Sequence, residues 1–341
     1  MIPGLLLAIS CGLCWGVFLA PMRLLRAWEW ENIWSVWTVL AMLVGPLVVA
    51  ACTVPQFISI NQTIGWQVLL FTAGMGFISG ISGFLFSYTV PVVGIGLASS
   101  LNAGGSLAVS LLPLLVLHSR TIAHRSGIFT LAGVGISVWG LWFCGKGGSL
   151  RDKELAEKKG AEKPNHRFSF AQCIALNVIA GSISSSMNVF LAFPNPIFTV
   201  AHDYKLTEFQ TAVEFLAPYM VGGFFSNIFY TTYVLRKNHT FSRFYNDSLR
   251  CFAWTALMAM VFLIGTISYA YSVELLGSFG AIITWGVSGA AMIVFSTLWD
   301  VTLGQWYGKA ARKMAMGVAV LLTSIIVLGM AQYFYQINPS G

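Results

Sequence analysis

The sequence predicts an all-α membrane protein with ten transmembrane helices, arranged as two inverted five-helix repeats. Three observations carry this prediction: the composition, the number of apolar segments, and a short turn that recurs in the second half. The chain is 57% hydrophobic and 9% charged, and its mean hydropathy is +0.75. Soluble domains carry about 25% charged residues, so this much apolar surface has to face lipid.

Ten apolar segments are long enough to cross a bilayer, which takes about 20 residues. We expect the first to be a true span because no basic region precedes it and no small-residue cleavage site precedes a soluble domain. The ten segments are 2–21, 33–53, 66–88, 92–117, 126–145, 169–190, 211–234, 251–271, 275–299 and 314–334.

Basic residues are distributed very unequally among the loops between these segments. Of the 19 Lys and Arg residues, all but Arg120, Arg125 and Lys205 lie in the odd-numbered loops. The positive-inside rule then places the odd loops in the cytoplasm and both termini outside. These loops also account for the net charge of +7, so the charge gives no reason to expect a nucleic-acid partner.

A strongly polar stretch near the middle of the chain, KGGSLRDKELAEKKGAEKPNHRF, occupies 146–168. Its composition predicts a mobile cytoplasmic linker. It divides the chain into a first five-helix repeat (1–145), the linker (146–168) and a second five-helix repeat (169–341).

Two short stretches of the first half recur in the second. YTVPVVG at 88–94 is echoed by YSVELLG at 271–277, and VFLAP at 17–21 is echoed by VFLAFP at 189–194. Because five is odd, a second copy of a five-helix unit enters the membrane upside down. Inverted repeats are typical of secondary transporters, which bind substrate near the midplane between the repeats. An ordinary helix bundle with coincidental likeness is the alternative.

One carboxyl, Glu214, lies inside a predicted span, where an ionisable residue is costly and therefore suggests function. Pro218 follows four residues later. Proline has no N–H, so the carbonyl of residue 214 loses its helical partner and would lie beside the carboxyl. The carboxyl and the freed carbonyl together could carry a proton, bind another cation or bind a sugar hydroxyl. A solvated carboxyl at the membrane edge is the alternative.

Amides and tryptophans within the spans could bind a sugar, since amides pair with hydroxyls and an aromatic ring covers the apolar C–H face. Helix packing and interfacial anchoring explain such residues equally well. Trp285 also lies at depth. The predicted substrate-binding residues are Trp15, Trp37, Asn102, Asn188, Glu214 and Asn227, and Glu214 is also the predicted proton-coupling residue.

The sequence contains no P-loop, zinc motif, G-x-S-x-G or dinucleotide-binding fingerprint. Six cysteines are scattered, mostly within apolar segments. We therefore expect no cofactor, no metal site and no catalytic residue. A membrane-embedded enzyme would need His, Asp or Glu clustered in the spans, and a sensor would be expected to carry a soluble output domain.

The stretch FLAPMRLLRAWEWENIWSV at 18–36 resembles the bacterial L-rhamnose–proton symporter family of the drug/metabolite transporter superfamily. That family shows an aromatic-x-Ala-Pro, a basic stretch and a W-x-W-E-x-x-W-S-V run. Further likeness lies at Gly222-Gly223 with Asn227, and at Gln305-Trp306 followed by Arg312-Lys313, although the family commonly has Glu where Gln305 stands.

The resemblance implies ten helices and uptake of a small, L-rhamnose-like sugar by cation symport through alternating access, with the proton as the expected cation. It also implies residence in the bacterial inner membrane. The partners are then the sugar, a proton or another cation, and the bilayer. The sequence leaves open an exporter or an amino-acid or metabolite permease of the same fold.

Overall fold

The computed structural model describes residues 1–93, 95–117, 119–159, 169–193, 195–302, 306 and 308–337. Within these ranges the chain is helical and contains no strand, as the sequence predicts. The α-helices are α1 (Ile2–Val17), α2 (Trp30–Thr38), α3 (Gly45–Thr53), α4 (Phe57–Ile64), α5 (Trp66–Val93), α6 (Ile95–Ser110), α7 (Leu112–Leu117), α8 (Arg125–Lys159), α9 (Phe170–Ser184), α10 (Ser186–Ala192), α11 (Pro196–Asp203), α12 (Glu208–Asn238), α13 (Ser248–Leu276), α14 (Gly280–Thr302) and α15 (Gly308–Ile337).

Nine helical stretches of the described chain are long and apolar enough to cross a membrane. They coincide with nine of the ten predicted segments. The remaining segment, predicted over 92–117, forms α6 and α7, and its apolar part Leu101–Leu117 is shorter than the other nine. The all-α membrane class is therefore confirmed, with about nine candidate spans.

The second predicted span is one long stretch of helix that changes its hydrogen-bond pattern in the middle. Between α2 and α3 lies the π-helical turn η2 (Val39–Val44), in which the N–H of Gly45 donates to the carbonyl of Leu40. Pro46 follows directly and supplies no N–H. A π turn is a known way to absorb such a loss within a helix.

Helix α8 extends further than the sequence analysis expects, because it continues to Lys159 and takes in the first part of the predicted linker. The reason is local: the extension LRDKELAEKK consists largely of strong helix formers, and Gly160 is the next residue. The rest of the predicted linker, 160–168, and Gln305 lie outside the described residues.

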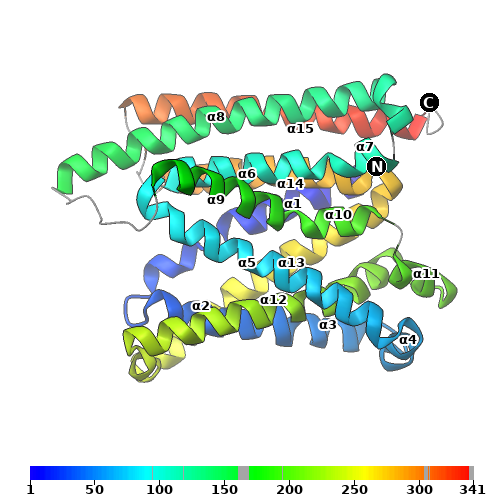
Figure 1. Ribbon diagram of the computed structural model, residues 1–341, viewed down its shortest axis with the longest axis horizontal. Helices are drawn as coiled ribbons and strands as arrows, with labels where there is room; N and C mark the ends of the chain where they lie inside the picture. Colours follow the sequence, from blue (N-terminus) through cyan, green and yellow to red (C-terminus); the bar gives the residue numbers. More distant parts are fainter. Residues whose placement is uncertain are drawn as a thin grey trace.

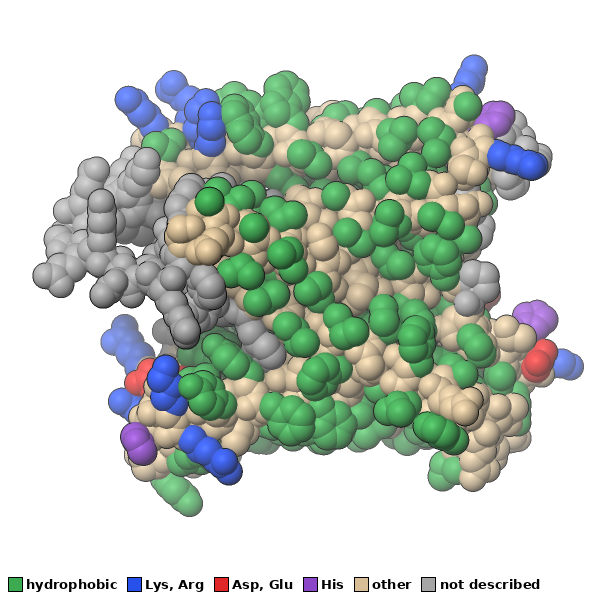
Figure 2. Space-filling model, viewed as in Figure 1, with side chains coloured by type: hydrophobic (Ala, Val, Ile, Leu, Met, Phe, Trp, Pro, Cys, Tyr) green, Lys and Arg blue, Asp and Glu red, His purple; other side chains and the backbone are tan. Residues whose placement is uncertain are grey.

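The helices run along the long axis of the molecule, and α1 begins at the same end at which α15 finishes (Figure 1). The pair α8 and α15 forms one outer layer, and α12 with α2 and α3 forms the opposite one. Between them, α1 packs on α13 and α14, while α9 packs on α5 and α6. Side chains on the viewed face are largely apolar along the middle, and Lys and Arg gather at the two ends (Figure 2).

Glycines allow helix backbones to touch at the contact between α5 and α12. A Cβ at Gly76 would collide with the carbonyl of Tyr219, and a Cβ at Gly222 would collide with the carbonyl of Ala73. The two helices therefore approach more closely than any residue with a side chain would permit. Gly12 of α1 meets Ala291 of α14 in the same way.

Candidate functional site

Three aromatic rings from α1, α13 and α14 form a cluster at the centre of the molecule. The ring centroids of Trp15 and Tyr269 lie 5.6 Å apart, those of Trp15 and Trp285 6.2 Å, and those of Tyr269 and Trp285 5.5 Å. These distances are typical of favourable aromatic pairs.

Each ring of this cluster is held in place by a hydrogen bond to a different helix. Trp15 Nε1 donates to Thr266 Oγ1 at 3.2 Å, and Trp285 Nε1 donates to Ser106 Oγ at 2.8 Å. The Tyr269 hydroxyl donates to Asn188 Oδ1 at 2.7 Å. Because their polar atoms are occupied, the rings are fixed in orientation and offer apolar faces.

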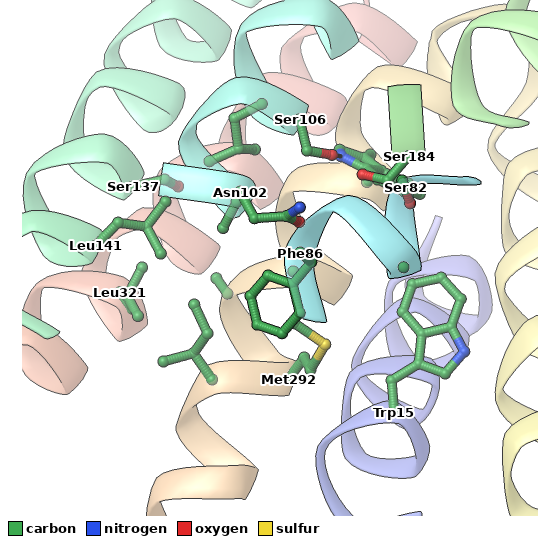
Figure 3. Close-up of a pocket in the computed structure, with 17 residues that line it drawn as sticks. Trp15, Ser82, Phe86, Asn102, Ser106, Ser137, Leu141, Ser184, Met292 and Leu321 are labelled. Atoms are coloured by element: carbon green, nitrogen blue, oxygen red, sulfur yellow. Dashed lines mark hydrogen bonds between the residues drawn. The ribbon is translucent and has the colours of Figure 1, made fainter. Parts of the chain in front are cut away.

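Two of these rings, Trp15 and Trp285, line a cavity of about 340 Å³ (Figure 3). This volume falls in the range of small-molecule sites. Most of the lining is apolar, including Phe86 and Met292, and the polar side chains on it are Ser82, Asn102, Ser106, Ser137 and Ser184. They come from α5, α6, α8 and α9.

The chemistry of this lining suits a neutral ligand with several hydroxyl groups. Among the described side chains that line the cavity there is no Asp, Glu, Lys, Arg or His. The hydroxyl of Ser137 is buried and has no hydrogen-bond partner in the described part of the chain. Serine hydroxyls and an amide can both donate to and accept from a polyol, and the tryptophan faces can cover its C–H groups. No group of three potential metal ligands exists among the described residues.

A second cavity of about 390 Å³ adjoins the first, because Trp15, Phe86, Met292 and Ile293 line both. Its far end is formed by polar and aromatic residues from α8, α14 and the segment before α15. There Arg151 pairs with Asp300 at 3.4 Å, and its guanidinium carbon lies 4.6 Å from the centroid of the Trp306 ring. The two cavities together lead from the central cluster toward the end of the molecule where this ion pair lies.

The structure brings only some of the predicted site residues to this cavity. Trp15 and Asn102 line it. Asn188 is fully buried behind the aromatic cluster, where it accepts the Tyr269 hydrogen bond. Trp37 and Asn227 lie in a different cluster, and Glu214 does not line the cavity.

Trp37 belongs to a stack of tryptophans on α2. The centroids of Trp30 and Trp34 lie 5.5 Å apart, and those of Trp34 and Trp37 lie 4.4 Å apart. Trp34 Nε1 donates to Asn227 Oδ1 at 3.2 Å, and Asn227 Nδ2 donates to the carbonyl of Gly223 at 2.9 Å. The stack thereby joins α2 of the first half to α12 of the second.

The acidic residues beside this stack connect α2 to the end of α12 and to the segment that follows it. Glu31 Oε1 accepts hydrogen bonds from Asn238 Nδ2 at 3.0 Å and from Thr240 Oγ1 at 2.8 Å. Glu29 pairs with Arg243 at 3.1 Å. The W-x-W-E-x-x-W run therefore makes structural contacts throughout the region in which it lies.

Glu214 is fully buried on α12, and neither carboxyl oxygen has a hydrogen-bond partner in the described part of the chain. The side chain of Asn61 on α4 lies close enough to interact with it. Pro218 is inside the same helix, so it supplies no N–H to the carbonyl of residue 214. The carboxyl is thus deeply enclosed rather than solvated at the end of the helix.

Tyr269 and the four serines of the cavity were not predicted from the sequence, and Trp285 was noted only for its depth. A signal existed for Ser106, which lies one helical turn after Asn102 and therefore on the same face of α6. The other serines carried no such signal, because serine in a span commonly bonds to its own helix. Ser184, for example, donates to the carbonyl of Gly181 at 2.7 Å.

Comparison with known proteins identifies the family. The sequence model of the family described as L-rhamnose-proton symport protein (RhaT) matches residues 2–332. The L-rhamnose-proton symporter of Cronobacter sakazakii is 23% identical over 346 aligned residues, covering 95% of this chain and 99% of that protein. Those of Shigella dysenteriae and Klebsiella pneumoniae are 21% and 22% identical with the same coverage. The chain therefore belongs to the L-rhamnose-proton symport protein (RhaT) family.

Proposed function

We propose that this protein is a secondary transporter that imports L-rhamnose or a closely similar sugar together with protons. The observation that carries the proposal is the central cavity, where Trp15 and Trp285 face a set of serine hydroxyls and the amide of Asn102. A 6-deoxy sugar presents an apolar face with a methyl group and an edge of hydroxyls. That combination matches an uncharged cavity with two tryptophans and several hydroxyl partners. The names of the relatives point to the same ligand class.

We propose ten crossings arranged as two inverted repeats, as expected for the drug/metabolite transporter superfamily. The helix contacts support this arrangement, because exchanging the halves maps one set of contacts onto the other. The contact of α1 with α13 and α14 corresponds to that of α9 with α5 and α6, and the contact of α6 with α8 corresponds to that of α14 with α15. The repeated turn sequences also begin near the ends of α5 and α13, at opposite ends of the molecule (Figure 1).

The proposed orientation has both termini outside the cell and the linker in the cytoplasm, in the inner membrane of a bacterium. It follows from the distribution of Lys and Arg between the two ends. In this orientation, the second cavity and the Arg151–Asp300 pair lie on the cytoplasmic side. Alternating access would require this pair to separate when the sugar leaves inward.

Uptake of labelled L-rhamnose into proteoliposomes tests the function directly. The purified protein is reconstituted, and initial rates are compared with an inward proton gradient, without a gradient, and with a protonophore. We expect uptake that the gradient stimulates and the protonophore reduces. An uptake rate that is the same with and without the proton gradient would contradict proton coupling. The absence of any uptake of L-rhamnose or related sugars would contradict the substrate class.

We further propose that Glu214 carries the coupled proton, although it lies outside the sugar cavity. Helix α10 supplies a physical connection between the two. Tyr219, on the same helix as Glu214, shares a 3.2 Å hydrogen bond with Ser186 of α10, and Asn188 of α10 accepts from Tyr269 at 2.7 Å. A change of charge at Glu214 that shifts α12 would therefore move α10 and, through it, the aromatic cluster.

The test of this role is the variant Glu214→Gln, which keeps the shape of the side chain and removes its ionisation. We expect it to retain sugar exchange between equal concentrations inside and outside, and to lose accumulation driven by a proton gradient. Glu208→Gln, an exposed position on the same helix, is the matched control and should keep both activities. Normal gradient-driven accumulation by Glu214→Gln would rule out the proposed role.

A further inference from the structure

A groove of about 800 Å³ lies on the flank of the molecule among α6, α8, α9 and α15. Of the described residues that line it, Leu141 is the one that also lines the sugar cavity, and none of the polar residues proposed to bind the sugar lines it. Small residues of α6 create it. A Cβ added at Gly104 would meet nothing within 4 Å, and Ala108 lines the groove one turn further on. On the same helix, by contrast, a Cβ at Gly105 would press on the backbone of α9 at Val178. The space beside Gly104 is therefore real room for a ligand.

The groove is polar at one end and apolar along the rest of its length. Lys146, Ser149 and Lys313 line the polar end, while Val138 and Ala108 are among the apolar residues that line the rest. Along α8, Val138 and Lys146 are eight residues apart, which corresponds to about 12 Å. Such a gradient matches an amphiphile with an anionic head and an acyl chain.

Each of the two lysines at the polar end lies against an aromatic ring. Lys146 Nζ lies 3.7 Å from the centroid of the Trp142 ring, and Lys313 Nζ lies 5.5 Å from that of Phe143. In the described part of the chain, the ion pairs involve neither lysine. Among the described residues that line the groove there is no Asp or Glu, and Lys146 and Lys313 place two positive charges at its mouth.

We propose that this groove binds an anionic phospholipid, with the phosphate between Lys146 and Lys313 and one acyl chain along Gly104, Ala108 and Val138. Basic pockets between transmembrane helices recognise anionic head groups by this combination of charge and apolar room. Trp142, which is 49% exposed, would lie at the level of the head groups, where tryptophan is enriched. The bound lipid would fill the space between α8 and the pair α6 and α9.

The experiment uses the full chain, purified in detergent and stripped of lipid. Binding of phosphatidylglycerol and of phosphatidylcholine with identical acyl chains is measured by native mass spectrometry and by the shift in melting temperature. We expect phosphatidylglycerol to bind roughly thirtyfold more tightly, from two lysines near the head group. Equal binding of the two lipids by the wild-type protein would overturn the proposal without any variant. A shift produced equally by inorganic phosphate would reduce the site to a simple anion site and also overturn it.

Three variants localise the effect. The double variant Lys146→Gln with Lys313→Gln should lose the preference for phosphatidylglycerol. Gly104→Leu should weaken the binding of both lipids, because the leucine side chain fills the groove. The control variant Lys309→Gln with Arg312→Gln also removes two positive charges, but from exposed positions of α15, and should leave the binding of both lipids unchanged. The melting temperature of each lipid-free variant shows whether it is folded. A preference that persists in the folded Lys146 and Lys313 variant, or disappears in the control pair, would contradict the assignment.

Discussion

The tryptophans of the central cluster and those of α2 occupy opposite kinds of surroundings. Trp15 and Trp285 place one face against protein and line a cavity, and their N–H groups bond to Thr266 and Ser106. Trp37 is 2% exposed and is enclosed by Trp34, Phe18 and Phe262, with centroids at 4.4, 5.8 and 4.8 Å. The first cluster leaves space for a ligand, whereas the second fills its space with its own rings.

The difference shows that residue type does not decide between binding and packing in a membrane span. Both clusters are rich in tryptophan and both include an asparagine with a bonded amide. What distinguishes them is whether small residues leave a void beside the rings. Gly83 and Gly289 line the cavity, while bulky side chains surround Trp37.

Removing a ring from the cavity should chiefly impair transport. Trp15→Ala takes away an apolar platform, and we expect the KM for L-rhamnose to rise about 10- to 100-fold, as for the loss of one large buried contact. Uptake kinetics in proteoliposomes, normalised to folded protein, measure this effect. A KM that stays within twofold of the wild-type value would place the sugar elsewhere.

Removing a ring from the α2 stack should chiefly impair stability. Trp37→Ala leaves a void in a closed cluster, and we expect a loss of about 3–5 kcal/mol in the free energy of unfolding. Thermal unfolding in detergent should show a lower melting temperature, while the protein that remains folded keeps the wild-type KM. A raised KM with normal stability would move Trp37 into the binding site.

A milder pair of variants removes one N–H from each cluster and keeps an aromatic ring. Trp34→Phe leaves Asn227 Oδ1 without its donor in a closed setting, which should cost about 1–3 kcal/mol of stability. Trp285→Phe frees Ser106 beside the cavity, where water can replace the donor, so stability should hold and the KM should rise about 2- to 10-fold. The same two measurements separate the variants, and identical effects from both would remove the distinction between the clusters.

The smallest effect is expected at a single hydroxyl. Ser137 lines the cavity and its Oγ has no partner in the described part of the chain, so Ser137→Ala should leave the melting temperature unchanged. If the sugar uses this hydroxyl, the KM should rise about 2- to 10-fold. Ser110→Ala is the control, because Ser110 donates to the carbonyl of Leu107 at 2.7 Å and does not line the cavity. Equal KM values for the two variants would exclude Ser137 from the site.

The helices were predictable because each crossing must be apolar over its whole length, and such apolar runs can be identified in a single sequence. The predicted segment 251–271, for example, lies wholly inside α13. Boundaries were less predictable where charged helix formers carry a helix beyond the membrane, as in α8. The run of apolar residues predicts which part of a helix lies in lipid. The residue at which the helix ends depends instead on helix propensity and on the next glycine.

The site was predictable only in part, because its residues meet through packing between distant segments. Trp15 and Asn102 were selected for depth and polarity, and the structure brings both to the cavity. The same criteria selected Trp37 and Asn227, which bond or pack within another cluster. Nothing in the chain near Tyr269 indicates that its ring will stack on Trp15, 254 positions earlier, because that contact depends on how α1 and α13 pack.

The packing of α1 against α13 and α14 has a consequence for biosynthesis. Gly12 meets Ala291, so the partner of the first helix is made about 280 residues after it. At translation rates of about 5–20 residues per second, α1 would wait roughly 15–55 s for this partner. During that interval its small-residue face, with Ala8 and Gly12, has lipid, the helices made before α14 or an insertion factor to contact. The nascent first half is therefore an incomplete structure whose final closure depends on the last helices of the chain.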